Sequence, residues 1–131
     1  IDQLLTQFNV GVLTGRPLSE AHMALDSMEL DISDDYVMAM ENSPSKKPHP
    51  AGLISLAEKF NSSSLVYVGD TLDDIKTVVN ATKADPSRNY RGVGVLTGGL
   101  SGISGKKMFE ENGADAVIST VNDLPELLLN F

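Results

Sequence analysis

The stretch that decides the fold is Leu65-Val66-Tyr67-Val68-Gly69-Asp70-Thr71-Leu72-Asp73-Asp74. Its four consecutive apolar residues, 65–68, are typical of a strand that is buried on both faces of a parallel sheet. The acids that follow open a helix, so they lie at the carboxyl edge of the sheet, where open α/β folds bind their ligands. Three acids within five residues are typical of a Mg²⁺ site, or equally of an N-cap followed by solvated first-turn acids.

Length, composition and charge set limits on the class of protein. The chain has 131 residues, 41% of them hydrophobic, a net charge of −8 and no cysteine. These values predict one globular domain without disulfides or thiolate chemistry, and they disfavour nucleic acids and anionic membranes as partners. No apolar run approaches the roughly 20 residues of a membrane span, and no signal peptide is visible. We therefore expect a cytoplasmic protein.

Hydrophobic periodicity predicts alternating strands and helices along the whole chain. Strands are expected at 10–13, 36–40, 65–68, 92–96 and 116–118. Helices are expected at 1–8, 17–29, 51–60, from 70 through 79, from the glycine-rich loop to 112, and after 123. This alternation is the signature of an α/β fold in which helices cover both faces of a mostly parallel sheet.

Two further loops carry chemistry-bearing residues toward the same edge of the sheet. Thr14-Gly15-Arg16 follows the first predicted strand, and Lys47 lies in a proline-rich loop before a helix. A hydroxyl, a backbone N–H and an ammonium group together form a phosphate cradle, and acids that hold Mg²⁺ beside it complete a site for phosphoryl transfer. Taken singly, Thr14 is more often a turn residue and Lys47 a solvated lysine.

The three loops together resemble the haloacid dehalogenase (HAD) superfamily, in particular its phosphoglycolate-phosphatase-like branch. Leu13–Pro17 is similar to the second motif of that family, Lys47–Leu53 to the third and Val68–Asp74 to the fourth. The segment 113–118 is similar to the last strand of the family's core. The resemblance implies a three-layer Rossmann-like core over 1–131 as one domain, the C-terminal portion that holds motifs II, III and IV.

The same resemblance implies the function and the roles of individual residues. It implies a Mg²⁺-dependent phosphatase that acts on a small phosphorylated metabolite through an aspartyl-phosphate. Thr14, Gly15, Arg16 and Lys47 would bind the phosphoryl group, and Thr14, Lys47 and Asp70 would be the catalytic residues.

The chain is similar to the family at the metal ligands but lacks the family's nucleophile motif. Asp70 would ligate Mg²⁺ directly, Asp74 directly or through water, and Asp73 would be an outer acid. The family's first motif, Asp-x-Asp-Gly-Thr, supplies the nucleophile, and it does not occur in these 131 residues. Its strand lies between the strands that end at Thr14 and Gly69, so we expect a sheet that lacks its central strand, in a chain that also lacks the cap domain. The slot is expected to be filled by a missing N-terminal segment, a swapped strand or a dimer partner, because unpaired strand edges are costly.

Other functions remain open from the sequence. A chain without its nucleophile fits a non-catalytic module that binds phosphate and Mg²⁺. A receiver-like signalling domain also combines acids, Thr and Lys around Mg²⁺, but in receivers the acidic pair comes first in the chain, whereas here the acids come last. Dehalogenase chemistry dispenses with the metal, so the pair Asp70 and Asp74 disfavours it.

Overall fold

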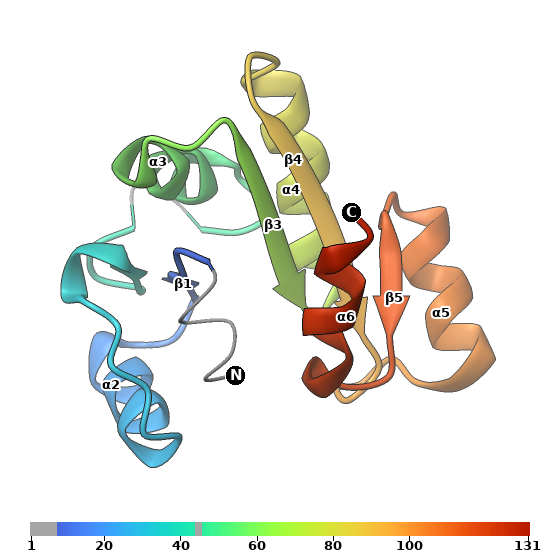
Figure 1. The fold of residues 1–131 in the computed structure, drawn as a ribbon, viewed down its shortest axis with the longest axis horizontal. Coiled ribbons are helices and arrows are strands. Elements are labelled where there is room, and N and C mark those ends of the chain that lie inside the picture. The colour runs from blue at the N-terminus through green and yellow to red at the C-terminus, as the bar shows by residue number, and fades with distance from the viewer. Residues whose placement is uncertain (1–7, 44–45) are drawn as a thin grey trace.

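The computed structural model describes residues 8–43 and 46–131, and the helix expected at 1–8 lies almost entirely outside them (Figure 1). The strands are β1 (Val12–Leu13), β2 (Val37–Met38), β3 (Ser64–Gly69), β4 (Asn89–Val95) and β5 (Ala116–Ile118). The α-helices are α2 (Leu18–Ser27), α3 (Ala51–Phe60), α4 (Leu72–Ala84), α5 (Gly102–Glu111) and α6 (Leu124–Leu129). Two short 3₁₀ turns are η1 (Asp34–Tyr36) and η2 (Val121–Asp123). The predicted α/β alternation is confirmed.

All strand pairs are parallel, but the strands form two sheets rather than one. β1 pairs with β2, and β3, β4 and β5 form a second sheet in that order. The hydroxyl of Tyr67 in β3 lies 2.9 Å from the carbonyl oxygen of Leu13 in β1, so β1 and β3 are the strands that face each other across the break. The break therefore falls where the family resemblance places the strand that carries the first motif.

The break explains why β3 is less buried than its apolar sequence predicts. Every residue of β3 keeps some exposure, whereas Val93 and Val95 of the neighbouring β4 are almost fully buried. A strand reaches full burial only when it is paired on both edges and covered on both faces. Within the described residues β3 is paired only with β4, so the expectation of a strand buried on both faces is wrong here.

Local hydrogen bonds shorten the strand that was expected at 36–40. Tyr36 belongs to the 3₁₀ turn η1, and the Ala39 N–H donates to Oδ1 of Asn42 at 2.6 Å instead of to a neighbouring strand. In contrast, β4 begins earlier than expected because Asn89 already pairs with Ser64 of β3. The polar connection between α4 and β4 therefore spans four residues, 85–88.

Three apolar clusters hold the helices against the two sheets. The first joins both sheets through α3 and α4, and it contains Leu13, Met38, Leu53, Leu56, Ala57, Val78, Ala81 and Tyr90. The second packs α6 on the other face of the larger sheet, so α4 and α6 lie on opposite faces of β3 and β4 (Figure 1). The third packs α2 against Val12 and Val37 of the smaller sheet. The expected layers, helices on both faces of parallel strands, are thus confirmed.

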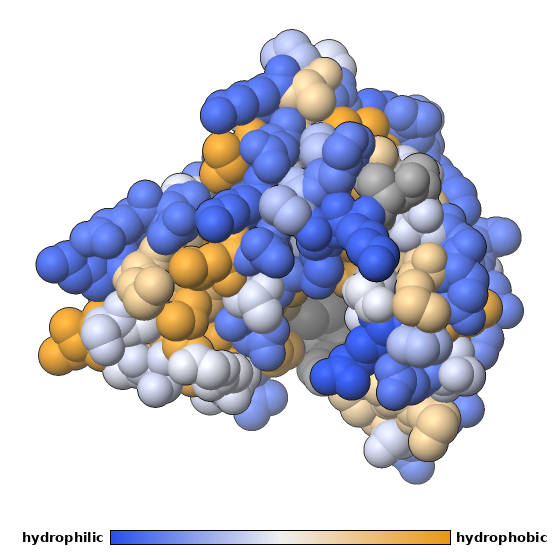
Figure 2. Space-filling model, turned by 180° about the vertical axis from the view of Figure 1, so that it is seen from behind, coloured by the Kyte–Doolittle hydropathy of each residue, from blue (hydrophilic) through white to orange (hydrophobic). Residues whose placement is uncertain are grey.

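The surface seen from behind is largely hydrophilic, with separate apolar areas (Figure 2). The most exposed large apolar side chain is Ile103 at the start of α5, which is 90% exposed. None of the helices in the described ranges is long and apolar enough to cross a membrane.

Candidate active site

A sharp strand-to-helix junction builds the centre of the site. Thr71 caps α4: its hydroxyl oxygen accepts a hydrogen bond from the Asp74 N–H, and Oδ2 of Asp74 accepts one from the Thr71 N–H, both at 3.2 Å. This reciprocal capping box satisfies two backbone donors that a helix otherwise leaves unpaired. A Cβ atom at Gly69 would overlap the Asp74 carboxylate, so the glycine is what allows the strand to end this close to the helix.

Asp74 is buried and paired with Lys47. Its Oδ1 lies 2.6 Å from the Lys47 ammonium, and the Asp74 side chain is only 5% exposed against 23% for Lys47. The pair connects motifs that are far apart in the sequence, because Lys47 lies in the loop before α3 and Asp74 in the first turn of α4. Both carboxylate oxygens of Asp74 are therefore occupied, one by Lys47 and one by the cap.

Tyr67 is the site residue that the sequence analysis missed. Its hydroxyl lies 3.2 Å from Oδ1 of Asp74 and 3.4 Å from the Lys47 ammonium, in addition to its bond to Leu13 of β1. Burial, and then the neighbouring Asp74 charge, raise the pKa of Tyr67 well above its usual range, so the hydroxyl keeps its proton. A signal was present in the sequence: Tyr67 is two residues before Gly69 in a strand and so lies on the same face.

The end of β1 brings Thr14 into the neighbourhood of this cluster. The Thr14 N–H donates to the Met38 carbonyl at 2.9 Å, and the Thr14 hydroxyl oxygen accepts from the Arg16 N–H at 3.2 Å. Gly15 and Arg16 are exposed, and the Arg16 guanidinium lies 4.0 Å from Glu20 of α2. Of the four predicted phosphate-binding residues, the structure thus brings Lys47 close to the end of β1. The Arg16 side chain instead points toward Glu20 of α2.

Asp70 and Asp73 are exposed, unlike Asp74. Within the part of the chain that the structure describes, the Asp70 carboxylate forms no hydrogen bond or ion pair. In residues 8–43 and 46–131, no three His, Cys, Asp or Glu side chains come close enough together to hold a metal ion between them. The donor set still suits Mg²⁺, which keeps several waters and is usually held by one or two carboxylates. Of Asp70 and Asp74, the two predicted ligands, Asp70 is the one whose carboxylate oxygens have no hydrogen-bond partner within the described residues.

The topology places these residues at a point where ligands bind in open α/β folds. From β1 the chain moves outward to β2, and from β3 it moves outward in the other direction to β4 and β5. The winding therefore reverses between β1 and β3, and ligands bind at the carboxyl ends of the strands on either side of such a switch point. Thr14 follows β1 and Asp70 follows β3 at this point.

A comparison with models of protein families shows which family the chain belongs to. The family model for haloacid dehalogenase-like hydrolases matches residues 1–83, which include β1, the Lys47 loop, β3 and all but the last residue of α4. This chain belongs to the family of haloacid dehalogenase-like hydrolases. No curated protein sequence matches it at a significant level.

Solved structures of HAD-like proteins share its fold. A conserved HAD-like protein of unknown function from Agrobacterium tumefaciens is 19% identical, with a TM-score of 0.80 over 99% of this chain and 59% of that chain. A hydrolase from Pseudomonas syringae is 22% identical, with a TM-score of 0.78 over 99% and 58%. A predicted phosphoglycolate phosphatase from Haemophilus somnus is 20% identical, with a TM-score of 0.74 over 97% and 53%. This HAD-like chain therefore spans between half and three-fifths of these relatives.

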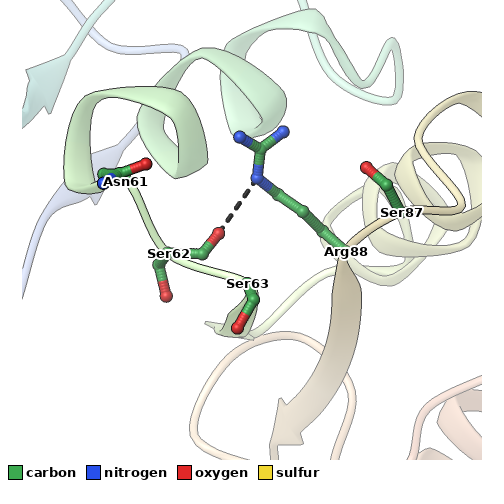
Figure 3. Close-up of a pocket in the computed structure, with 5 residues that line it drawn as sticks. All are labelled: Asn61, Ser62, Ser63, Ser87 and Arg88. Carbon is green, nitrogen blue, oxygen red and sulfur yellow. Dashed lines mark hydrogen bonds between the residues drawn. The ribbon is translucent and has the colours of Figure 1, made fainter.

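A shallow hollow lies at the opposite end of the sheet from this site. It measures about 230 Å³ and is lined by Asn61, Ser62, Ser63, Ser87 and Arg88, around the amino end of β3 (Figure 3). The Arg88 side chain is already bonded: Nε donates to the Ser62 carbonyl at 2.9 Å and Nη1 to the Asp85 carboxylate at 2.8 Å. Because the Asp85 carboxylate neutralises this arginine, the hollow offers little free positive charge to an anion.

Proposed function

We propose that this chain is part of a Mg²⁺-dependent phosphatase that hydrolyses a small phosphorylated metabolite. The observation that carries the proposal is the cluster at the switch point, where the Lys47 ammonium, Asp74 and the end of β1 meet beside the exposed Asp70 carboxylate. Membership of the HAD-like hydrolases and the fold shared with a predicted phosphoglycolate phosphatase support it. The reaction would pass through an aspartyl-phosphate whose aspartate lies outside these 131 residues.

Lys47 is the group that neutralises the phosphate in this proposal. Its ammonium has three N–H donors. One faces Asp74 at 2.6 Å and a second faces the Tyr67 hydroxyl at 3.4 Å, which leaves a third for a phosphoryl oxygen. The bond to Asp74 holds the ammonium in place before the substrate arrives, so little side-chain ordering remains to be done on binding.

Thr14 and Gly15 supply neutral donors for the same phosphoryl group. The Thr14 oxygen already accepts from the Arg16 N–H, so its own proton is available to donate to a phosphoryl oxygen. The exposed Gly15 carries no side chain that would keep a ligand away from its backbone N–H, and open space surrounds the position of a Cβ atom there. Arg16 joins the phosphate site only if its guanidinium leaves Glu20, an exposed pair worth little energy.

Asp70 would hold the magnesium ion directly. Asp74 would act through a water molecule, because direct ligation would replace its bond to Lys47 or to the helix cap. Bound there, Mg²⁺ would neutralise charge on the transferring phosphoryl group. Asp73 remains an outer acid in this proposal, since it is exposed on α4 and its carboxylate has no hydrogen bond or ion pair within the described residues.

We further propose that an additional parallel strand occupies the space between β1 and β3. Each of these strands pairs on one side only within the described residues, and open strand edges attract a further strand. The occupant would be a segment of the whole protein, a swapped strand or a partner, and it would carry the nucleophile. The acidic, cysteine-free chain supports a cytoplasmic protein that does not bind nucleic acid or membranes.

The experiment uses the purified whole polypeptide in which this sequence occurs. Its intact mass is measured first, and hydrolysis of p-nitrophenyl phosphate is then followed with and without Mg²⁺ for the wild type, Asp70→Asn and the matched control Asp73→Asn. We expect Mg²⁺-dependent turnover that D70N abolishes and D73N retains. Turnover that D70N leaves unchanged would overturn the assignment of Asp70.

A second candidate is a binding module without turnover. It is favoured by one observation, the absence of any Asp-x-Asp-Gly sequence from the 131 residues. A polypeptide whose intact mass is 14.0 kDa, which binds Mg²⁺ and phosphate but hydrolyses nothing, would establish it. A larger mass together with turnover would exclude it.

A further inference from the structure

The loop after β4 lies directly against the Asp70 side chain. A Cβ atom at Gly98 would lie 2.7 Å from Oδ2 of Asp70, 2.9 Å from its Cβ and 3.0 Å from its Cγ. At the next residue, Gly99, a Cβ atom would meet nothing within 4 Å. Neither glycine adopts a positive φ, so the backbone at both positions accepts alanine. The two neighbours therefore differ in one respect, their distance from Asp70.

The loop is fixed on both sides of Gly98. Before it, the Leu96 N–H donates to the Ile118 carbonyl at 3.0 Å, which ties the end of β4 to β5. After it, Leu100 packs on Gly105 of α5 so closely that a Cβ atom there would lie 2.8 Å from the Leu100 carbonyl carbon. Because the loop is held on both sides, we expect a side chain added at position 98 to displace the Asp70 side chain, whose Oδ2 is the nearest atom, rather than the loop.

Gly98 lies against the Asp70 side chain, and no hydrogen bond within the described residues orients that carboxylate. Its backbone is held by the strand and the helix cap, but its side chain forms no hydrogen bond or ion pair there. A carboxylate without hydrogen bonds is oriented by what it touches. Changing a residue that orients a metal ligand commonly changes metal affinity.

We propose that Gly98 is a positioning residue for Asp70, and that the loop 97–99 forms a third side of the candidate metal site, next to the loops that follow β1 and β3. The proposal rests on the proposed function, in which Asp70 binds the metal. It concerns orientation alone: Gly98 touches Asp70 and supplies no ligand of its own.

The test compares Gly98→Ala with Gly99→Ala as the matched control. Mn²⁺ serves as a paramagnetic probe for the Mg²⁺ site, and its dissociation constant is measured by electron paramagnetic resonance on each purified variant, with urea unfolding as a check of stability. We expect G98A to weaken Mn²⁺ binding by about tenfold or more and G99A to stay within about twofold of the wild type. Equal affinity of G98A and G99A would overturn the proposal.

Two further measurements separate this proposal from the proposed function. If Asp70→Asn binds Mn²⁺ as the wild type does, Asp70 is not a metal ligand, and the proposed roles of Asp70 and Gly98 are both wrong. If D70N loses Mn²⁺ binding while G98A retains it, the proposed role of Gly98 is wrong but that of Asp70 stands. A readout that needs no folded variant is the amide NMR signal of Gly98 in the wild type: it should shift during a Mg²⁺ titration with the dissociation constant of the site, and its failure to shift would contradict the placement of the loop.

Discussion

Replacing Lys47 by methionine should destabilise the fold strongly. Methionine keeps most of the side-chain length and removes the charge, so the 5%-exposed Asp74 carboxylate, now 2.6 Å from its ammonium partner, loses its counter-ion. Breaking a buried ion pair in this way costs about 3–5 kcal/mol. Tyr67 and the Thr71 N–H remain beside the carboxylate, so we expect the lower end of that range, about 3 kcal/mol.

The assay is urea unfolding followed by far-ultraviolet circular dichroism. The matched control is Lys107→Met, which removes a lysine that is 74% exposed and lies 3.9 Å from Glu111. An exposed pair at this spacing contributes about 0.3–0.5 kcal/mol, so K107M should change the free energy of unfolding very little. Adding Asp74→Asn and the double variant completes a double-mutant cycle, with an expected coupling of about 0.5–3 kcal/mol.

One result would refute the reasoning about this pair. If the loss of stability in K47M matched that in K107M, the Asp74 carboxylate would not depend on Lys47, and the ion pair could not be what connects the two motifs. A coupling energy near zero in the cycle, with both single variants destabilised, would mean that the two residues act separately.

Three further predictions concern the same junction and the opposite end of the sheet. Tyr67→Phe removes the one hydroxyl proton that the Leu13 carbonyl and the Asp74 carboxylate share, so urea unfolding should show a loss of about 1–3 kcal/mol, and an unchanged midpoint would contradict this. Thr71→Ala removes the α4 cap and should cost about 1 kcal/mol in the same assay, whereas a change below a few tenths would show that the cap is dispensable. Hydrogen bonds from Ser87, Arg88 and Tyr90 lower the pKa of Asp85 from 3.8 to about 2. The ionised Asp85 therefore stabilises the folded state fully above about pH 3.8, and this contribution is lost as the pH falls toward 2. The difference in stability between the wild type and Asp85→Asn should therefore shrink from about pH 5 to about pH 2, and a constant difference would refute it.

Local sequence patterns predicted the elements around the site well. The helix expected at 51–60 has these bounds in the structure, and strand β3, Gly69 and the following helix come in the order that the sequence indicates. These features depend on neighbours in the chain: apolar periodicity, a glycine at a turn, a cap. The capping box was equally local, since Thr71-x-x-Asp74 is its signature, and it shows that Thr71 rather than Asp70 is the N-cap.

Features that depend on contacts between distant segments could not be predicted. The two-residue strands β1 and β2 are set by their mutual pairing and by the 3₁₀ turn before β2, so periodicity overestimated their length. The bonds of Tyr67 to Leu13 and to Lys47 join residues that lie far apart in the chain, so its position in the strand indicates the face on which it lies but not these partners. The pairing of Asp74 with Lys47, which makes direct metal ligation costly, is of the same kind.

The order of the strands has a consequence for how quickly this chain can fold. Strands that pair are also consecutive in the chain: a helix joins β1 to β2, another joins β3 to β4, and a third joins β4 to β5. Each β-α-β unit can close its own short loop before it meets the other, and folding rates rise as native contacts become more local. Contacts between the two sheets close a longer loop, through α3, α4 and the Tyr67 hydroxyl. Docking of two preformed halves, rather than formation of either half, should therefore limit the folding rate.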